Sequence, residues 1–253
     1  MANTSLAQTS ASTSNPRRDS NAIATLTSAL AAMGGAPAYG GTSDLTISGS
    51  CESQQTDGSV ASTSFKWITA GNEFLYVNST SGGQTSMASG HGMPWATDVD
   101  GTVHQLSAST SSHDRAFFAP GLLLLTAINK GNAALRYVGV EQIPQGNAIH
   151  IQTQQTSAGY ALPGTREDWY FDPNSHLPLQ YTYTVPGQGA ANYLAHITVN
   201  YSNWKSFGTV ISPGTLTTAL DSETQTTICS VSSLTINTHP DASVFNSANG
   251  GAQ

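Results

Sequence analysis

The chain has 253 residues, of which 38% are hydrophobic and only 9% are Asp, Glu, Lys or Arg, whereas an average soluble domain has roughly 25% charged residues. With 32 Ser and 31 Thr, about a quarter of the chain carries a small hydroxyl, so the surface is polar through hydroxyl groups rather than charges. The net charge is −7 with only eight Lys and Arg, which excludes the basic stripe of a nucleic-acid-binding protein. The most continuous apolar stretch, Ala116 to Ile128, spans 13 residues, fewer than the ~20 of a membrane-spanning helix.

One domain is expected between two polar, low-complexity termini. Residues 1–18 and 247–253 are rich in small and polar residues, a composition typical of disordered segments. No linker or repeat divides residues 19–246, and a β-rich unit of this size can form one domain. The first residues lack a charged segment followed by an apolar one, so no signal peptide is visible. Because Ser/Thr-rich, Lys-poor chains are common outside the cytoplasm, we expect a periplasmic or secreted protein whose signal peptide has been removed.

The first predicted element is an N-terminal helix. Asp19 or Ser20 can cap its start, and Gly34-Gly35 can end it after Met33. Its apolar residues recur every three or four positions and form one stripe. The residues of this stripe are Ile23, Leu26, Leu30 and Met33.

Alternating apolar and polar residues predict about 11 strands between Leu45 and Asn237. The alternation is clearest over residues 179–185, where aliphatic and aromatic side chains face one way and Gln and Thr the other. Residues 208–212 and 215–220 are expected as two separate strands. Meandering strands with one polar face indicate an antiparallel sheet that is solvated on one side.

Two local irregularities of the sheet can be read from the sequence. Asp100-Gly101 lies between two short strand-like runs and predicts a hairpin turn. In the last strand Val231 and Leu234 are three residues apart, which shifts the alternation and predicts a β-bulge near Ser232.

A central helix interrupts the strands. Residues 117–128 are apolar on every side, Pro120 suits a first helical turn, and Lys130-Gly131 suits a helix end. Ser112 or Asp114 could begin a shorter helix before it. A helix without a polar face is either buried in the core or packed in the concave mouth of the sheet, where it lines or covers an apolar cavity.

The two cysteines, Cys51 and Cys229, lie far apart in the sequence. They form either one disulfide, which an oxidising compartment permits, or two buried thiols. Alternation places Cys51 in phase with Leu45 and Ile47 and Cys229 in phase with Val231, so both point inward. A bond between them would join the first and last long strands and is expected to pin the two ends of the barrel.

No catalytic or metal-binding signature is present. The sequence lacks a Gly-x-Ser-x-Gly motif, a phosphate-binding loop and a dinucleotide-binding glycine pattern. His91, His104 and His113 lie within 23 residues, near Asp98 and Asp100, but their spacing matches no zinc-ligand pattern. We therefore predict no catalytic residues, no metal and no cofactor, and a protein that is not an enzyme.

The order of elements resembles the bacterial periplasmic lipoprotein-sorting carriers (the LolA-like and LolB-like superfamily). The resemblance covers about residues 20–246 and rests on this order together with short segments. The first segment is the helix that leads into Leu45–Gly49. The second is Trp169–Leu179, which contains a strand, an Asp-Pro turn and a Leu-Pro strand start. The others are Ile197–Trp204, Gly208–Pro213 and Ile236–Phe245.

The resemblance implies a mainly β (α+β) fold, an unclosed antiparallel half-barrel whose concave face is covered by the N-terminal and central helices. It implies a non-enzymatic protein that binds the acyl chains of a lipid or lipoprotein in an apolar cavity, as a carrier or sensor, with peripheral membrane contact left open. The second hypothesis is a structural protein of a filament or surface layer, which has a filled core and can self-assemble. The third hypothesis is a hydrolase. The expected cavity residues are Leu26, Leu30, Phe65, Trp67, Phe117, Phe118, Leu122, Leu125, Tyr137, Tyr181 and Tyr183.

Overall fold

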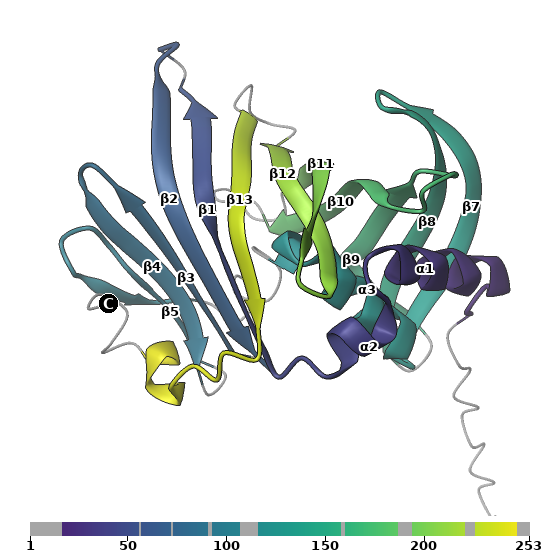
Figure 1. Cartoon of the computed structure of the whole chain (residues 1–253), viewed down its shortest axis with the longest axis horizontal. Helices are drawn as coiled ribbons and strands as arrows, with labels where there is room; N and C mark the ends of the chain where they lie inside the picture. Colours follow the sequence, from purple (N-terminus) through teal and green to yellow (C-terminus); the bar gives the residue numbers. More distant parts are fainter. Residues whose placement is uncertain are drawn as a thin grey trace, which may run out of the picture.

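One open sheet forms the frame of the protein (Figure 1). The computed structural model describes residues 17–55, 57–71, 73–90, 93–106, 116–157, 160–186, 194–220 and 226–246. Within these residues thirteen strands follow the order β6-β5-β4-β3-β2-β1-β13-β12-β11-β10-β9-β8-β7, and neighbouring strands pair antiparallel. The edge strands β6 and β7 do not pair with each other, so the sheet is the expected unclosed half-barrel.

The sheet divides into two wings that meet where β1 pairs with β13. The β1–β6 wing consists of β1 Asp44–Gln54, β2 Val60–Ala70, β3 Glu73–Thr80, β4 Gly83–Gly90, β5 Met93–Thr97 and β6 Val103–Gln105. The β7–β13 wing consists of β7 Ala133–Ile143, β8 Gly146–Ser157, β9 Tyr160–Phe171, β10 Pro178–Pro186, β11 Leu194–Phe207, β12 Val210–Leu220 and β13 Thr226–Ile236.

The helices begin and end where the sequence predicts. The first, α1, spans Ser20–Ala32, and the Asp19 side chain caps it by accepting hydrogen bonds from two backbone N–H groups of its first turn. The central helix, α3, spans Pro120–Asn129 and follows a short 3₁₀ turn, η1 (Ala116–Phe118). A further short helix, α2 (Gly35–Gly40), follows α1 and is not predicted by the sequence.

The expected number of about 11 strands is too low, and β4 is one reason. Its sequence, Gly-Gln-Thr-Ser-Met-Ala-Ser-Gly, contains almost no large apolar residues and therefore shows no alternation. The strand forms because β3 and β5 pair with it on both sides. Tertiary pairing here overrides a weak local preference.

The two strands expected over residues 208–212 and 215–220 are in fact one strand, β12. Pro213-Gly214 suggests a turn, but Gly214 lies opposite Asn203 of β11, whose φ is 53°. A Cβ atom at Gly214 would collide with the Asn203 carbonyl oxygen. The glycine therefore permits a close approach of two strands rather than a turn.

The inner face of the sheet, defined here as the face that carries the main hydrophobic cluster, packs against α1, α2, α3 and η1. Figure 1 shows these helices beside β7 to β9 rather than over β2 to β5. The β1–β6 wing reaches the same cluster through Phe65, whose ring stacks on Phe118 of η1 at a centroid distance of 4.6 Å. The main core is therefore continuous across both wings.

The outer face of the β1–β6 wing carries a second, separate cluster. Ile68 of β2 pairs with Leu75 of β3. Each is next in the chain to a residue that points inward, Trp67 or Tyr76, so both point to the outer face. They are covered by the C-terminal turn η2 (Ala242–Phe245), which lies beside β3 and β4. The outer face of this wing is thus buried where η2 packs against it.

The chain leading to η2 is fixed to the start of β1. The buried carboxylate of Asp44 accepts hydrogen bonds from the backbone N–H and hydroxyl of Thr238 and from the backbone N–H of His239. Burial by itself raises the pKa of Asp44, but these bonds and one from Ser43 outweigh it and lower the pKa. At the other end, the Trp95 indole N–H donates to the Phe245 carbonyl at 3.1 Å.

Cys51 and Cys229 form a disulfide with an S–S distance of 2.09 Å. They are direct partners in the pairing of β1 with β13, and both lie in the main cluster. The expected inward orientation and the bond are confirmed, but its expected place at the barrel ends is wrong. The first and last strands of the chain are neighbours in the middle of the sheet, so the disulfide fastens the two wings together.

The predicted bulge and hairpin are both present. Ser48 pairs with Ser233 and Gly49 with Val231, which leaves Ser232 as the extra residue of β13. β5 and β6 form the hairpin around Asp100-Gly101, and Gly101 has a φ of 85°. Residues 1–16 and 247–253, His91, and Ser112, His113 and Asp114 lie outside the described residues.

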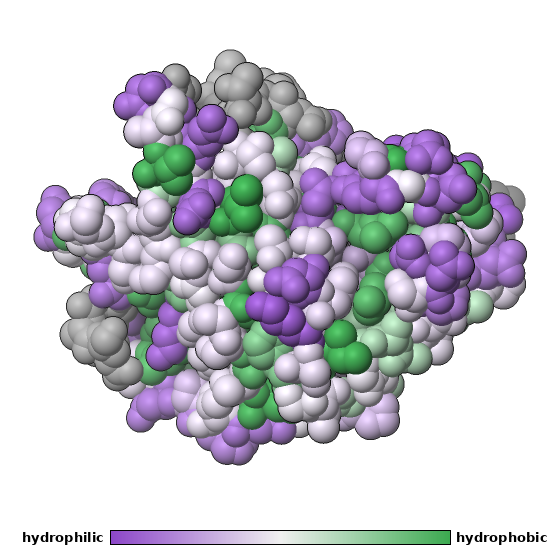
Figure 2. All heavy atoms as spheres, turned by 45° about the horizontal axis from the view of Figure 1, so that its top comes forward, coloured by the Kyte–Doolittle hydropathy of each residue, from purple (hydrophilic) through white to green (hydrophobic). Residues whose placement is uncertain are grey.

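The surface matches the Ser/Thr-rich composition. Figure 2 shows mostly pale, weakly polar residues with separate green apolar areas between them. No helix among the described residues has the length and hydrophobicity to cross a membrane.

Candidate functional site

The predicted cavity residues come from α1, β2, η1, α3, β7 and β10 and meet in one cluster on the inner face of the sheet. All eleven belong to the main hydrophobic cluster. Eight are buried: Leu26, Leu30, Phe65, Trp67, Phe117, Phe118, Tyr181 and Tyr183. Three are partly exposed and pack against the same cluster: Leu122, Leu125 and Tyr137. Their shared location fits the expected site, and their contact with a ligand stays a prediction.

The helix α3 lies on this face and is apolar except for the exposed Thr126 and Asn129. Leu124 is fully buried, whereas four other large apolar side chains of the helix remain partly exposed. These four are Leu122, Leu123, Leu125 and Ile128. These four side chains leave part of their apolar surface exposed to water, and a bound ligand could bury that surface.

Both ends of α3 are fixed by contacts that the sequence analysis missed. At its start, a Cβ atom on Gly121 would overlap the Tyr39 ring of α2, so only glycine permits this packing. At its end, the Arg18 guanidinium donates to the carbonyl oxygens of Ala127 at 3.2 Å and Ile128 at 2.5 Å. The last turn of α3 contains no basic residue of its own, so Arg18 supplies the positive charge that a helix C-terminus favours.

Arg18 reaches α3 because its own backbone is joined to the edge strand. It forms a bridge with Leu135 of β7, and the Leu135 N–H donates to the Arg17 carbonyl. From the sequence, Arg18 was assigned to the polar N-terminal segment. The contact could have been suspected only from the lack of a basic residue in the last turn of α3.

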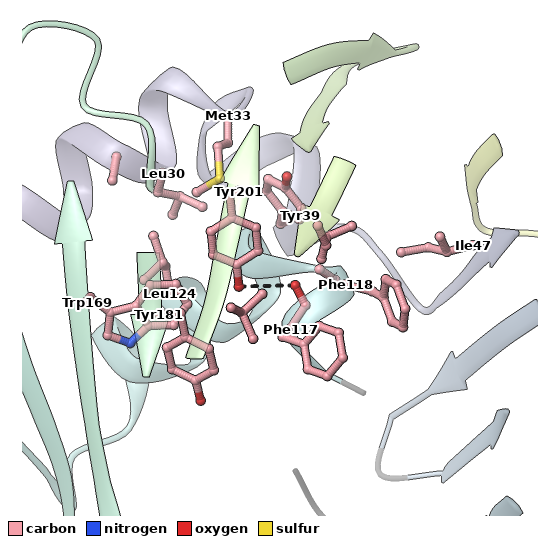
Figure 3. Close-up of a cluster of buried hydrophobic side chains, with 14 of the residues drawn as sticks. Leu30, Met33, Tyr39, Ile47, Phe117, Phe118, Leu124, Trp169, Tyr181 and Tyr201 are labelled. Carbon is pink, nitrogen blue, oxygen red and sulfur yellow. Dashed lines mark hydrogen bonds between the residues drawn. The ribbon is translucent and has the colours of Figure 1, made fainter. Parts of the chain in front are cut away.

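Before α3, η1 is anchored in the same core. The Tyr201 hydroxyl donates to the Phe117 carbonyl oxygen at 3.2 Å (Figure 3). Phe117 and Phe118 lie with ring centroids 4.7 Å apart. Complete burial raises the pKa of Tyr201 well above its usual value, so this hydroxyl stays protonated and acts as a donor.

A polar group interrupts the apolar inner face, and the sequence analysis did not identify it. Glu167 of β9 pairs with Thr153 of β8 and with Tyr183 of β10. The buried Thr153 hydroxyl donates to the Glu167 carboxylate at 2.7 Å. The signal was present in the sequence, because Glu167 shares its alternation phase with the inward Trp169 and Phe171.

Tyr181 lies beside Glu167 on the same face. Burial raises the pKa of Tyr181 well above its usual value, and the charge of Glu167 and a hydrogen bond to it act in the same direction. The Tyr181 ring contacts Trp169 at a centroid distance of 4.2 Å and stacks on Tyr183 at 5.0 Å. The inner face of β8, β9 and β10 therefore combines an acidic group with a row of aromatic rings.

The outer face of the same wing carries a charged network. The Asp168 carboxylate accepts hydrogen bonds from His150 at 2.8 Å, from Gln152 at 3.1 Å and from two nitrogens of Arg166 at 2.8 and 3.1 Å. Burial by itself raises the pKa of Asp168, but these donors and the Arg166 charge outweigh it and lower the pKa to about 2. Asp168 therefore stays ionised at all ordinary pH values.

His150 lies between two carboxylates in this network. Its Nε2 faces Asp168, its Nδ1 lies 3.1 Å from Glu141, and its ring stacks on Tyr170. Burial lowers the pKa of His150, but the hydrogen bonds and charges of Asp168 and Glu141 outweigh it and raise the pKa. A protonated histidine carries an N–H on both ring nitrogens, so its place between two carboxylates suits a structural ion pair better than a general base.

The histidines near the hairpin do not form a metal site in the part of the chain that the structure describes. The exposed His104 lies 2.7 Å from Asp98 across the hairpin turn. Among the described residues, no three His, Cys, Asp or Glu side chains gather closely enough to hold a metal ion.

Solved structures of other proteins share this architecture. A DUF1329 family protein from Desulfovibrio piger ATCC 29098 has a TM-score of 0.58 and 13% identity, covering 90% of this chain and 98% of its own. A domain assigned to outer-membrane lipoprotein sorting from Vibrio parahaemolyticus has a TM-score of 0.58 and 13% identity, covering 91% and 98%. A LolA superfamily protein from Nitrosomonas europaea has a TM-score of 0.58 and 11% identity, covering 89% and 97%.

The chain has a LolA-like fold. No protein-family model matches its sequence, and no curated protein does. At 11% to 13% identity the likeness concerns the fold alone. In this chain α1 and α3 pack on the inner face of the half-barrel, as the order of elements in the sequence suggested.

Proposed function

We propose that this protein is a non-enzymatic carrier or sensor that holds the acyl chains of a lipid or lipoprotein between α3 and the inner face of the β7–β13 wing. The observation that carries the proposal is α3 itself, an apolar helix that retains partly exposed Leu122, Leu125 and Ile128 against an aromatic sheet. One protein with this fold is assigned to lipoprotein sorting, which agrees with the same use here.

The apolar surface is sufficient for such a ligand. Burial of one CH₂ group contributes about 0.8 kcal/mol, so a twelve-carbon chain offers about 10 kcal/mol before the costs of association. Those costs are about 4 kcal/mol or more, which leaves about 6 kcal/mol or less, a dissociation constant of tens of micromolar or weaker for one chain.

The proposed location is extracytoplasmic, in the periplasm or the secreted fraction. The supporting observation is the Cys51–Cys229 disulfide at the junction of the wings, because such bonds persist mainly in oxidising compartments. Fractionation of the source cells followed by thiol labelling under denaturing conditions tests this proposal. A reduced pair in freshly isolated protein would contradict it.

The test of the function uses native mass spectrometry and displacement of a fluorescent fatty acid. We expect the wild type to bind one or two acyl chains, and Leu125→Asp to weaken binding at least tenfold because it places a charge on α3 against the chain. Val140→Asp is the matched control, since Val140 is 60% exposed on the edge strand β7. Equal binding by wild type and Leu125→Asp, or no binding by either, would overturn the proposal.

A second candidate, a self-assembling structural protein, has one observation in its favour. The half-barrel leaves an eleven-residue edge strand, β7, with an exposed Val140, and exposed edges promote pairing between chains. Light scattering separates the two candidates: a concentration-independent monomer would eliminate assembly.

A further inference from the structure

The acidic group on the inner face has no counterion among the described residues. The ion pairs of the described part of the chain involve His104, His150, Arg166 and His239 as cations, and none of these pairs includes Glu167. Of the acidic residues on described strands, Glu167 is the one that alternation places on the inner face beside Trp169 and Phe171. A carboxylate in such an apolar setting is costly unless a positive group pairs with it.

The carboxylate also retains free acceptor capacity. An ionised carboxylate can accept about four hydrogen bonds, whereas Thr153 and Tyr181 supply two donors. Glu167 is only partly buried, and it lies on the same inner face of the sheet as the cluster to which α3 belongs. A ligand that binds under α3 could therefore reach it.

A second polar atom on this face lacks a partner. The Trp169 side chain is 99% buried, and its indole N–H has no acceptor among the described residues. Figure 3 shows this nitrogen turned toward Tyr181, which is next to Glu167. Buried N–H groups are nearly always hydrogen-bonded, so an acceptor supplied by a ligand would satisfy it.

The unpaired groups require two different features of a ligand. Glu167 favours a positive hydrogen-bond donor, and the Trp169 N–H favours an oxygen acceptor, which an acyl carbonyl can supply. An acyl chain whose head group carries an amine has both features in one molecule.

We propose that the inner face selects acylated ligands with an ammonium head group, an inference that rests on the proposed function. Glu167, with Thr153, Tyr181 and Tyr183 around it, binds the ammonium group. The Trp169 N–H donates to the acyl carbonyl. The selectivity follows from charge-assisted hydrogen bonds in a site of low polarity. An anionic head group in the same place would meet the Glu167 charge and bind more weakly.

The test compares two probes with the same lauroyl ester chain, lauroyl-lysophosphatidylethanolamine and lauroyl-lysophosphatidylglycerol, by isothermal titration calorimetry below their micelle concentrations. We expect the wild type to bind the ethanolamine probe about tenfold more tightly, a difference of about 1.4 kcal/mol. Glu167→Gln should bring the ratio of the two affinities to about 1 while binding of the glycerol probe is kept or improved. Trp169→Phe should weaken both probes alike, since both contain the acyl carbonyl.

The matched control is Glu52→Gln, which removes the same charge from an exposed position on the outer face of β1 and should leave the tenfold preference intact. Equal affinities in the wild type, or a preference that survives in a folded Glu167→Gln protein, would overturn the inference while leaving acyl binding in place. No binding of either probe would instead overturn the proposed function, and the inference with it.

Discussion

The outer faces of the two wings are built by opposite means. On the β1–β6 wing, Ile68, Leu75 and Trp95 form an apolar patch that η2 covers with Phe245. On the β7–β13 wing, the same side of the sheet carries the charged network around Asp168 and His150 and has no covering segment among the described residues. The covering segments also differ in position: the helices pack on the inner face beside β7 to β9, whereas η2 packs on the outer face at β3 and β4.

The junction between the wings should show the largest effect. Cys51→Ala with Cys229→Ala should lower the free energy of unfolding by about 4 kcal/mol, because the bond closes a chain segment with a sequence separation of 178 residues. Urea unfolding of the oxidised wild type and the double variant measures this change. A loss below about 1 kcal/mol would show that strand pairing alone holds the wings together.

The apolar outer face should show the next largest effect. Phe245→Ala should destabilise the protein by about 3 kcal/mol, as other buried Phe-to-Ala changes do, by the same amount at every pH. Acyl binding should not change, since Phe245 lies in the outer cluster rather than the inner one. Ile228→Ala, at a residue that is 47% exposed, is the control and should cost little. Loss of acyl binding in a folded Phe245→Ala protein would refute the separation of the two clusters.

The charged outer face should instead respond to pH. The pKa of Asp168 is lowered from 3.8 to about 2 on folding, so its contribution of about 2 kcal/mol is present above pH 4 and is lost as the pH falls toward 2. Asp168→Asn should therefore be less stable than the wild type at pH 6, with the difference disappearing near pH 2. Unfolding curves at several pH values test this, with Glu52→Gln as the control. A difference that does not depend on pH would contradict the assignment.

The smallest effect is expected at the end of α3. Arg18→Ala removes the two hydrogen bonds to the Ala127 and Ile128 carbonyls and should reduce local stability by about 1 kcal/mol. Hydrogen exchange of α3 amides should become roughly fivefold faster, while that of α1 stays the same. Arg17→Ala keeps the backbone bridge to β7 and should behave as the wild type. Equal exchange in the two variants would mean that Arg18 does not hold α3.

The sequence predicted those elements that are determined by residues close to one another in the chain. The capping Asp19, the Gly34-Gly35 stop and Pro120 define α1 and α3 from the residues at their own ends. The shifted alternation around Ser232 likewise revealed the bulge. Each of these features depends on residues within a few positions of one another.

Elements that depend on distant partners were missed. The strand β4 has no pattern of its own and depends on its neighbours, and Pro213-Gly214 has the composition of a turn although β11 holds it within a strand. Of the site, the apolar residues could be predicted from hydrophobicity, whereas Glu167 required attention to the phase of β9. Arg18 could be assigned only once α3 and β7 were seen together.

An acyl chain is proposed to bind between α3 and the inner face of the β7–β13 wing. The most direct measurement is photo-crosslinking with a diazirine-bearing fatty acid, followed by peptide mass spectrometry. Labels are expected on α3 and on inward residues of β8 to β10, and unlabelled lysophosphatidylethanolamine should compete them away. Labels confined to the outer face, or spread over the surface without competition, would contradict it.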